Sequence, residues 1–360
     1  TDIVLTKLNS TGSALVGSTF IGGSADDGIN RRDDDGIGRS PTKIRNTNYF
    51  YADDYRGEVN LDDLGNTYVA TSSESNSFPI SVDAAQAIYT GSQSGVVFSL
   101  DPRLRQLRWS TYYGGNGKDA LYSIVLNSRN EVVIAGGTTS TNLAGVEDGY
   151  QSTNSGGIAE GFICKLDPTG KSILGATYFG TSSYDQILLA ELDQEDRIYV
   201  AGHTEGNFGV KGNVYSNANG KQFVSRFSAN LDSLELNAVY GSGRSLPDIT
   251  INAFLVDECG KVYVSGWGTD SERAGQNLRN MPLSPNAFQS TTDGQDFHLI
   301  VFTENLAALD FATYYGGNRT GDHVDGGTSR FDKKGIGYQS VCSSCPNDYP
   351  SMTQISDLPT

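Results

Sequence analysis

Carboxylates are the residues of this chain whose types and spacing could most readily do chemistry. Three runs of aspartate lie within residues 24–55, a charged stretch without the alternation of a strand: Asp26-Asp27, Asp33-Asp34-Asp35 and Asp53-Asp54. Carboxylates among backbone carbonyls are hard oxygen ligands that suit Ca²⁺, although this spacing is not that of an EF-hand loop. Two interpretations stay open. Either Asp33, Asp34 and Asp35 bind Ca²⁺, the one cofactor that the sequence suggests, or the stretch is a solvated acidic loop.

Cysteine chemistry is the second candidate. Cys342 and Cys345 form a C-x-x-C motif, which can serve redox chemistry, zinc binding or a local disulfide. A zinc site needs four ligands at matched spacing, and the sequence has no second C-x-x-C. We therefore expect a disulfide between Cys342 and Cys345, with free thiols as the alternative. Cys164 alternates with apolar residues and is expected to be buried, whereas Cys259 is expected in a hairpin turn.

Histidines are few and far apart in the sequence: His203, His298 and His323, the last flanked by Asp322 and Asp325. A catalytic triad is assembled in space, so spacing alone does not reveal one. Neither the G-x-S-x-G nor the H-E-x-x-H motif occurs. No nucleophile with an adjacent base emerges, and the sequence predicts no catalytic residue and no enzyme activity.

The charge of the chain excludes some partners. The 360 residues carry a formal net charge of −16, which repels phosphate backbones and disfavours nucleic-acid binding. No apolar run is long enough to cross a bilayer, so we expect no membrane insertion by this chain. The chain opens on a strand, part-way through a repeat and without a visible signal peptide, which favours a piece of a longer polypeptide.

Residues 161–204 contain the elements that recur. Apolar and polar residues alternate in GFICKLDPTGKSILGATYFG, a hairpin around a D-P-T-G turn, and again in a second hairpin ending in RIYVAGH. Two hairpins make four antiparallel strands, the content of one β-propeller blade. Val69, Ile134, Val200 and Val264 hold equivalent positions about 65 residues apart, so the sequence predicts an all-β propeller of four-stranded antiparallel blades.

The repeats belong to a single domain that covers residues 1–360. Whole blades are expected at 56–117, 118–182, 183–243 and 244–317, with a half-blade hairpin at 1–23, another at 324–341 and a polar tail at 346–360. Residues 24–55 are expected to be a surface loop insertion that can be shortened without unfolding the protein. The two halves could share one blade of a five-bladed ring or belong to separate blades. The second arrangement is the one that the sequence favours.

The repeat resembles the bacterial propeller repeat often called the SBBP repeat. Its features here are KLDPTG at 165–170, WSTYYGG at 109–115, KVYVSGW at 261–267 and Phe78-Pro79. Residues 2–8, 259–268 and 322–333 resemble, more narrowly, propellers of very large secreted proteins of Bacteroidota, which are gliding-motility-associated or surface proteins. The resemblance implies seven blades, secretion by the type IX system and an extracellular or cell-surface location.

The function expected from the residues and the resemblance together is non-enzymatic. The chain would be a rigid display, docking or adhesion platform in gliding or surface attachment. Its partners would be other proteins of a surface or secretion assembly, or glycans. The alternatives are a carbohydrate-active or other hydrolytic propeller, and a glycan-binding lectin. An enzyme needs carboxylates that converge at one mouth of the ring, whereas a lectin needs exposed aromatic residues at loop tips.

Overall fold

Segments in which apolar and polar residues alternate form β-strands throughout the computed structural model of this chain. The structure describes residues 1–30, 46–48, 51–217, 219–268, 278–317, 322–324, 330–332, 334–338 and 342–343. In these residues two short 3-10 segments, η1 (Tyr51–Tyr55) and η2 (Glu304–Leu306), are the only helical turns. The prediction of an all-β chain is confirmed.

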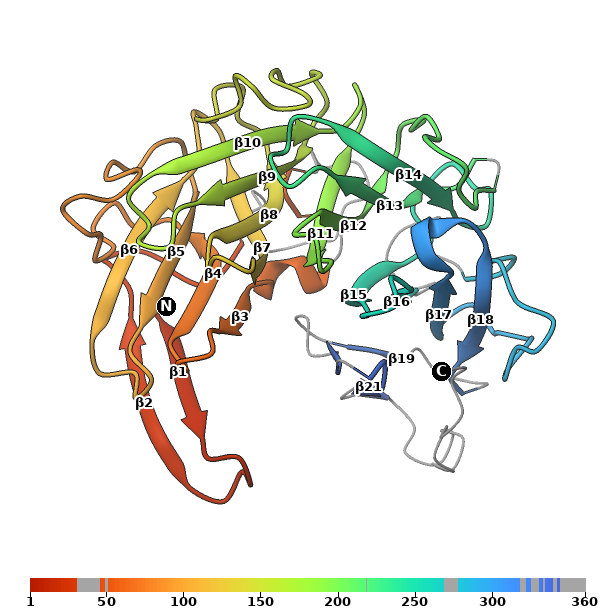
Figure 1. The fold of residues 1–360 in the computed structure, drawn as a ribbon, viewed down its shortest axis with the longest axis horizontal. Helices are drawn as coiled ribbons and strands as arrows, with labels where there is room; N and C mark the ends of the chain where they lie inside the picture. The colour runs from red at the N-terminus through yellow and green to blue at the C-terminus, as the bar shows by residue number, and fades with distance from the viewer. Residues whose placement is uncertain are drawn as a thin grey trace, which may run out of the picture.

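Four sheets of four antiparallel strands stand side by side as the blades of a β-propeller (Figure 1). Blade 1 is β3 (Glu58–Leu61), β4 (Thr67–Ser73), β5 (Ser94–Leu100) and β6 (Leu107–Tyr113). Blade 2 is β7 (Asp119–Leu126), β8 (Val132–Thr138), β9 (Glu160–Leu166) and β10 (Ile173–Phe179). Blade 3 is β11 (Asp185–Leu192), β12 (Ile198–Thr204), β13 (Gln222–Phe227) and β14 (Leu234–Tyr240). Blade 4 is β15 (Thr250–Val256), β16 (Val262–Trp267), β17 (Phe297–Phe302) and β18 (Leu309–Tyr315).

Each blade consists of an inner hairpin, formed by its first two strands, and an outer hairpin, formed by its last two. β3, β7, β11 and β15 face the inside of the arc, and β6, β10, β14 and β18 lie outermost (Figure 1). The expected limits 56–117, 118–182, 183–243 and 244–317 agree with these sheets. The four valine and isoleucine positions also agree, because Ile134 pairs with Ile124 and Cys164 just as Val200 pairs with Ala190 and Ser225.

The expectation that residues 161–204 form one blade is wrong. β9 and β10 belong to blade 2, whereas β11 and β12 open blade 3. Inner and outer hairpins alternate along the chain, so every outer hairpin has an inner hairpin before it and another after it. The hairpin β9–β10 is separated from β11–β12 by only a few residues, and this short separation favoured the wrong partner. The backbone instead pairs β8 with β9 across the longer connection 139–159, and the short link after β10 leads to the next blade.

The recurring aromatic residues pack between strands and connections. Tyr112, Tyr178 and Tyr314 occupy the same position of β6, β10 and β18, and all three are buried. Their hydroxyls accept hydrogen bonds from backbone amides of the connection in the same blade, at 3.2 Å from Phe78 and 2.9 Å from Leu143. Each tyrosine therefore holds the connection against its outer hairpin.

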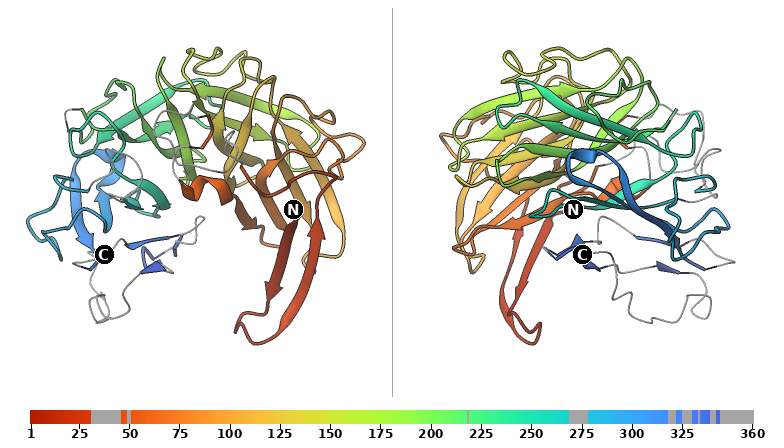
Figure 2. Two further views of the ribbon diagram at one scale, coloured as in Figure 1. Left: turned by 180° about the vertical axis from the view of Figure 1, so that it is seen from behind. Right: turned by 45° about the vertical axis from the view of Figure 1, so that its right-hand side comes forward.

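Two further hairpins lie beyond the whole blades. β1 (Ile3–Leu8) pairs with β2 (Leu15–Ile21), and this hairpin extends away from the sheets at one end of the arc (Figures 1 and 2). At the other end, β19 (Asp322–His323) pairs with β22 (Cys342–Ser343), and β20 (Arg330–Phe331) pairs with β21 (Gly337–Tyr338). Both half-blades expected from the sequence are thus present as separate two-stranded sheets.

A β-bulge explains the glycine of the V-x-G motif in blades 2, 3 and 4. The pairing shifts register between Leu121 and Ser123, Ile187 and Leu189, and Ile251 and Ala253. The bulge pushes a carbonyl of the inner strand towards the opposite residue, which is Gly136, Gly202 or Gly266. A Cβ at Gly202 would overlap the carbonyl oxygen of Gln186 and the ring of Phe223.

We expect Gly202→Ala to destabilise the protein by about 1–3 kcal/mol, because the buried strands must separate to admit the methyl group. The matched control is Gly209→Ala, since a Cβ there meets no atom within 4 Å and the change should stay within about 0.5 kcal/mol. Urea unfolding of both variants measures the difference. Equal midpoints for the two variants would contradict the close approach.

Candidate functional site

The centre of the arc is occupied by residues of the 24–55 insertion. η1 lies on the inner side of the blades beside β3 and β7 (Figure 1). Asn30, Asn46, Thr47, Asn48 and Asp53 are all buried. The expectation of a surface loop is therefore wrong for these residues, since the inner strands present polar side chains that need buried partners and the insertion supplies them.

Asn30 and Thr47 form the first half of this axial network. The Asn30 amide nitrogen donates to the Thr47 carbonyl at 3.0 Å and to the Tyr122 hydroxyl at 3.1 Å. Its amide oxygen accepts from Thr47 Oγ1 at 2.9 Å and from Gln93 Nε2 at 3.0 Å. Gln186 on β11 donates to the same Tyr122 hydroxyl at 2.9 Å. Asn30 thus ties the insertion directly to blades 1 and 2, and the Tyr122 hydroxyl extends the link to blade 3.

Arg56 and Asp53 form the second half. Their side chains are 3% and 0% exposed, and Arg56 Nε lies 2.9 Å from Asp53 Oδ1. Arg56 Nη2 donates to Thr250 Oγ1 at 2.7 Å and to the Ile251 carbonyl at 2.9 Å, both on β15. The guanidinium also lies 6.0 Å from the ring centre of Tyr122 on β7. A single arginine therefore connects η1 with blades 2 and 4. If either member of the Arg56–Asp53 pair were removed, the charge of the other would lose its opposite charge inside the protein.

Glu58, at the start of β3, links blade 1 to its neighbour. Its carboxylate accepts from Ser123 Oγ at 2.5 Å and from the Ile124 amide at 2.9 Å, and lies 3.4 Å from Arg330 Nη2. Burial raises the pKa of Glu58, while Arg330 and the two hydrogen bonds act in the opposite direction. This carboxylate is a contact between blades 1 and 2.

Buried aspartates close the link from each outer strand to the following inner strand. In all five links the carboxylate accepts the backbone amide of the residue that follows a glycine at the end of the outer strand. The amide–carboxylate pairs are Gly23–Asp27 (2.6 Å), Gly115–Asp119 (2.8 Å), Thr181–Asp185 (2.6 Å), Ser242–Asp248 (2.9 Å) and Gly317–Asp322 (2.8 Å). We call these five residues the linker aspartates.

Hydroxyl groups of the neighbouring strand complete these sites. Ser73 Oγ donates to Asp27 at 2.5 Å, Thr138 Oγ1 donates to Asp119, and Ser140 Oγ donates to Asp119 at 2.9 Å. Burial raises the pKa of Asp119 to about 6, and burial also raises the pKa values of Asp185 and Asp248. Raised pKa values are common in active sites, but these carboxylates face hydroxyls and amides of their own link.

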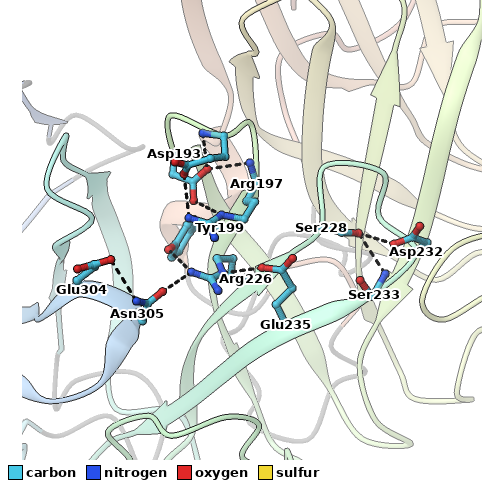
Figure 3. Close-up of polar contacts among 11 residues, drawn as sticks. Asp193, Arg197, Tyr199, Arg226, Ser228, Asp232, Ser233, Glu235, Glu304 and Asn305 are labelled. Atoms are coloured by element: carbon cyan, nitrogen blue, oxygen red, sulfur yellow. Dashed lines mark hydrogen bonds and ion pairs between the residues drawn. The ribbon is translucent and has the colours of Figure 1, made fainter.

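A third polar cluster joins blades 3 and 4 at the hairpin turns (Figure 3). Arg226 on β13 donates to the Tyr199 hydroxyl at 3.1 Å, to Glu235 at 2.8 Å and to Asn305 of η2 at 2.6 Å. Its guanidinium lies 5.7 Å from the ring centre of Tyr199. Nε and Nη1 of Arg226 therefore donate their hydrogen bonds to other residues of the protein.

The predicted Ca²⁺ ligands Asp33, Asp34 and Asp35 lie outside the described residues. The neighbouring aspartates have separate roles, because Asp27 is a linker aspartate, Asp53 pairs with Arg56, and Asp26 Oδ1 accepts from the amino group of Thr1 at 2.8 Å. Among the residues that the structure describes, no group of three or more acidic, histidine or cysteine side chains could hold a metal.

The cysteines and histidines fall as follows. The side chain of Cys342 and all of Cys345 lie outside the described residues, so their disulfide stays a prediction. Cys164 is buried in blade 2 as expected, and Cys259 is an exposed free thiol in the β15–β16 turn. His298 is buried, its Nε2 lies 2.8 Å from the Pro282 carbonyl, and burial lowers its pKa to about 4.

The linker aspartates were missed by sequence reasoning. Their signal was present, because an aspartate follows the end of each outer strand by a few residues, as in GGSADD at 22–27, GGNGKD at 114–119 and GTSSYD at 180–185. The axial network gave no such signal, since Asn30, Thr47 and Arg56 belong to a segment that occurs once.

Known proteins resemble this chain in structure and not in sequence. No protein-family model and no curated protein matches the chain. Solved structures that are similar include an exo-β-1,3-galactanase from Phanerochaete chrysosporium with β-1,3-galactotriose (8% identity, TM-score 0.35, covering 78% of this chain and 57% of that one). Others are a subtype N10 neuraminidase-like protein from a little yellow-shouldered bat isolate (9%, 0.36, 77% and 72%) and a PL25 ulvan lyase bound to a GlcA–Rha3S saccharide (9%, 0.37, 79% and 74%).

This chain spans little more than half the length of the galactanase that it matches. At these identities and TM-scores the similarity assigns no role to any residue of this chain. In the described part of the chain, no helix is long and apolar enough to cross a membrane.

We expect Arg56→Met to lower the free energy of unfolding by about 3–5 kcal/mol, because the Asp53 carboxylate would stay buried without the opposite charge of the guanidinium. Arg129→Met is the matched control. It removes an ion pair to Glu131 from a side chain that is 62% exposed, and about 1 kcal/mol or less is expected. Urea unfolding measures both. In a double-mutant cycle, Asp53→Asn should recover part of the loss in Arg56→Met. Equal losses for the two arginine variants would contradict the axial network.

We also expect a specific pH dependence from Asp119. The pKa of Asp119 is about 6 in the folded protein and roughly 3.9 in an unfolded chain. Between these two pH values the folded state keeps the proton on Asp119, whereas the unfolded state has lost it. The free energy of unfolding should therefore fall as pH rises from about 4 to about 6 and then level off. Asp119→Asn should reduce this fall by roughly 3 kcal/mol.

The control for this experiment is Asp101→Asn, in an exposed turn. Backbone hydrogen bonds from Gln106 and Arg105 lower the pKa of Asp101, so its contribution has the opposite sign. Urea titrations at several pH values measure the profiles. A profile of Asp119→Asn parallel to that of the unsubstituted protein would show that Asp119 does not titrate as described.

Proposed function

We propose that this chain is a non-enzymatic β-propeller module of a secreted cell-surface protein and acts as a rigid display or docking platform. One observation supports the proposal above the others. Arg56, Asp53 and the linker aspartates are buried, Glu58 is 14% exposed, and all of these charged groups are directed at other residues of the propeller. Their chemistry is used to hold the blades together.

The connections between inner and outer hairpins form the display face of this proposal. Exposed apolar side chains occur in each of the four: Val82 and Ile88 in blade 1, Tyr150 and Ile158 in blade 2, Val210 in blade 3, and Phe288 in blade 4. Loops on a rigid scaffold tolerate change and commonly carry binding residues. A ring held by buried polar links can present such loops without moving.

The location and partners in this proposal rest on the sequence resemblance. The SBBP-like repeat and residues 322–333 support an extracellular, cell-surface protein of the Bacteroidota type that is exported by the type IX system. A net charge of −16 is compatible with such a surface and unfavourable for nucleic acid. The partners of the proposal are proteins of the same surface or secretion assembly, in gliding or attachment, and glycans are the second class.

Binding through the connections can be tested by substitution. We expect Ile88→Ser and Phe288→Ser each to weaken retention of outer-membrane proteins or arrayed glycans on the immobilised protein at least tenfold, without changing Tm. Leu64→Ser is the control, because Leu64 is equally exposed but lies in a hairpin turn of blade 1. Retention that is equally affected by all three variants would contradict a display face on the connections.

A turnover screen runs beside the binding assay. Chromogenic glycosides, esters and peptides, and polysaccharides scored for reducing ends, should give no turnover above the blank. Turnover that is abolished by one carboxylate substitution, while Tm is unchanged, would overturn the non-enzymatic proposal.

A further inference from the structure

The hairpin β1–β2 exposes side chains that every whole blade buries. Val4 pairs with Phe20 in β1–β2, and the equivalent pair in blade 1 is Val96 with Tyr112. Val4 and Phe20 are 55% and 75% exposed, whereas Val96 and Tyr112 are 0% and 2% exposed. The same repeat position therefore lacks its cover in β1–β2.

The neighbouring strand that β1 lacks can be specified by register. β1–β2 matches β5–β6 residue by residue, down to the register shift after Lys7, which corresponds to the shift after Ser99. In blade 1 the other edge of β5 pairs with β4. The free edge of β1 is thus the edge that takes an inner hairpin in each whole blade, and an open edge of this kind is a template for strand pairing.

An inner hairpin without an outer partner is present at the other end of the chain. Asp322 pairs with Ser343 as Asp119 pairs with Thr138, and β20–β21 continues this hairpin to the turn at Asp332. β21 and β22 correspond to two parts of β4. Neither pairs with a further strand among those that the structure describes.

One ion pair already links this inner hairpin to blade 1. Asn60 of β3 donates to the Ile124 carbonyl of the following blade at 3.2 Å. Arg330 is the equivalent of Asn60 in the last hairpin, and it lies 3.4 Å from Glu58, one residue before the equivalent of Ile124. On the other side, Phe331 packs against Tyr263 of blade 4 with ring centres 5.9 Å apart. Five inner hairpins therefore follow one another around the axis.

We propose that the free edge of β1 is a docking site for the inner hairpin β19–β22 of the same chain, and that the pairing completes a fifth blade. This is the arrangement that the sequence alone ranked second. The expected register is antiparallel with Lys7 opposite Tyr338, as Ser99 lies opposite Tyr68 in blade 1 and Arg226 opposite Tyr199 in blade 3. Pairing also brings a partner strand beside Val4.

A disulfide placed in this register tests the proposal. Lys7→Cys and Tyr338→Cys are combined in the full chain after Cys259, Cys342 and Cys345 are changed to serine. Directly opposite residues of antiparallel strands have Cα atoms about 4.5–5.5 Å apart, within the range of a disulfide. The control moves one cysteine out of register, as Thr6→Cys with Tyr338→Cys, where the side chains leave opposite faces of the sheet.

On mild oxidation, the in-register variant should form an intramolecular disulfide in the monomer, and its Tm should rise and return on reduction. The out-of-register control should oxidise at least tenfold more slowly. A disulfide-linked dimer from the in-register variant would overturn the proposal in favour of a second copy as the occupant. No disulfide, or equal rates for the two variants, would overturn pairing of these edges altogether.

Discussion

A buried carboxylate that accepts a backbone amide is the interaction on which this propeller depends. Where the chain leaves an outer strand for the next inner strand, the backbone must turn between two packed sheets and cannot use sheet hydrogen bonds. An unpaired amide or an unpaired carboxylate there would each be costly, and the linker aspartate satisfies both at once. Five links repeat this solution, as at Gly115–Asp119 and Thr181–Asp185.

The axial network extends the same constraint to the centre of the arc. Inner strands converge there, and side chains such as Tyr122, Gln186 and Thr250 carry polar atoms into a region that is closed to solvent. Asn30 and Thr47 of the 24–55 insertion form hydrogen bonds with them on one side, and Arg56, the residue that follows η1, does so on the other. The buried residues of the insertion are therefore a structural component of the propeller.

The fold was predictable from the sequence because its signals are local and repeated. Alternation and turn residues located the strands, and the spacing of Val69, Ile134, Val200 and Val264 located the blades. The pairing of hairpins was less clear from the same signals. Residues 161–204 could be taken as one blade, whereas the limits 118–182 and 183–243 divide them between two blades, as the structure does. The roles of the candidate site residues were predicted less well than the fold. Asp27 and Asp53 looked alike as surface carboxylates, but one closes a link and the other pairs with Arg56, and both roles depend on residues distant in the chain.

Residue-resolved hydrogen exchange of backbone amides tests the central claim most directly. The amides of Gly115 and Thr181 lie outside the strands but donate to buried carboxylates. If the linker aspartates hold the blades together, these amides should exchange only through global unfolding, as slowly as those of Ile134 and Val200 in the central strands. Exchange at the rate of an exposed turn, while the strand amides stay protected, would contradict the account.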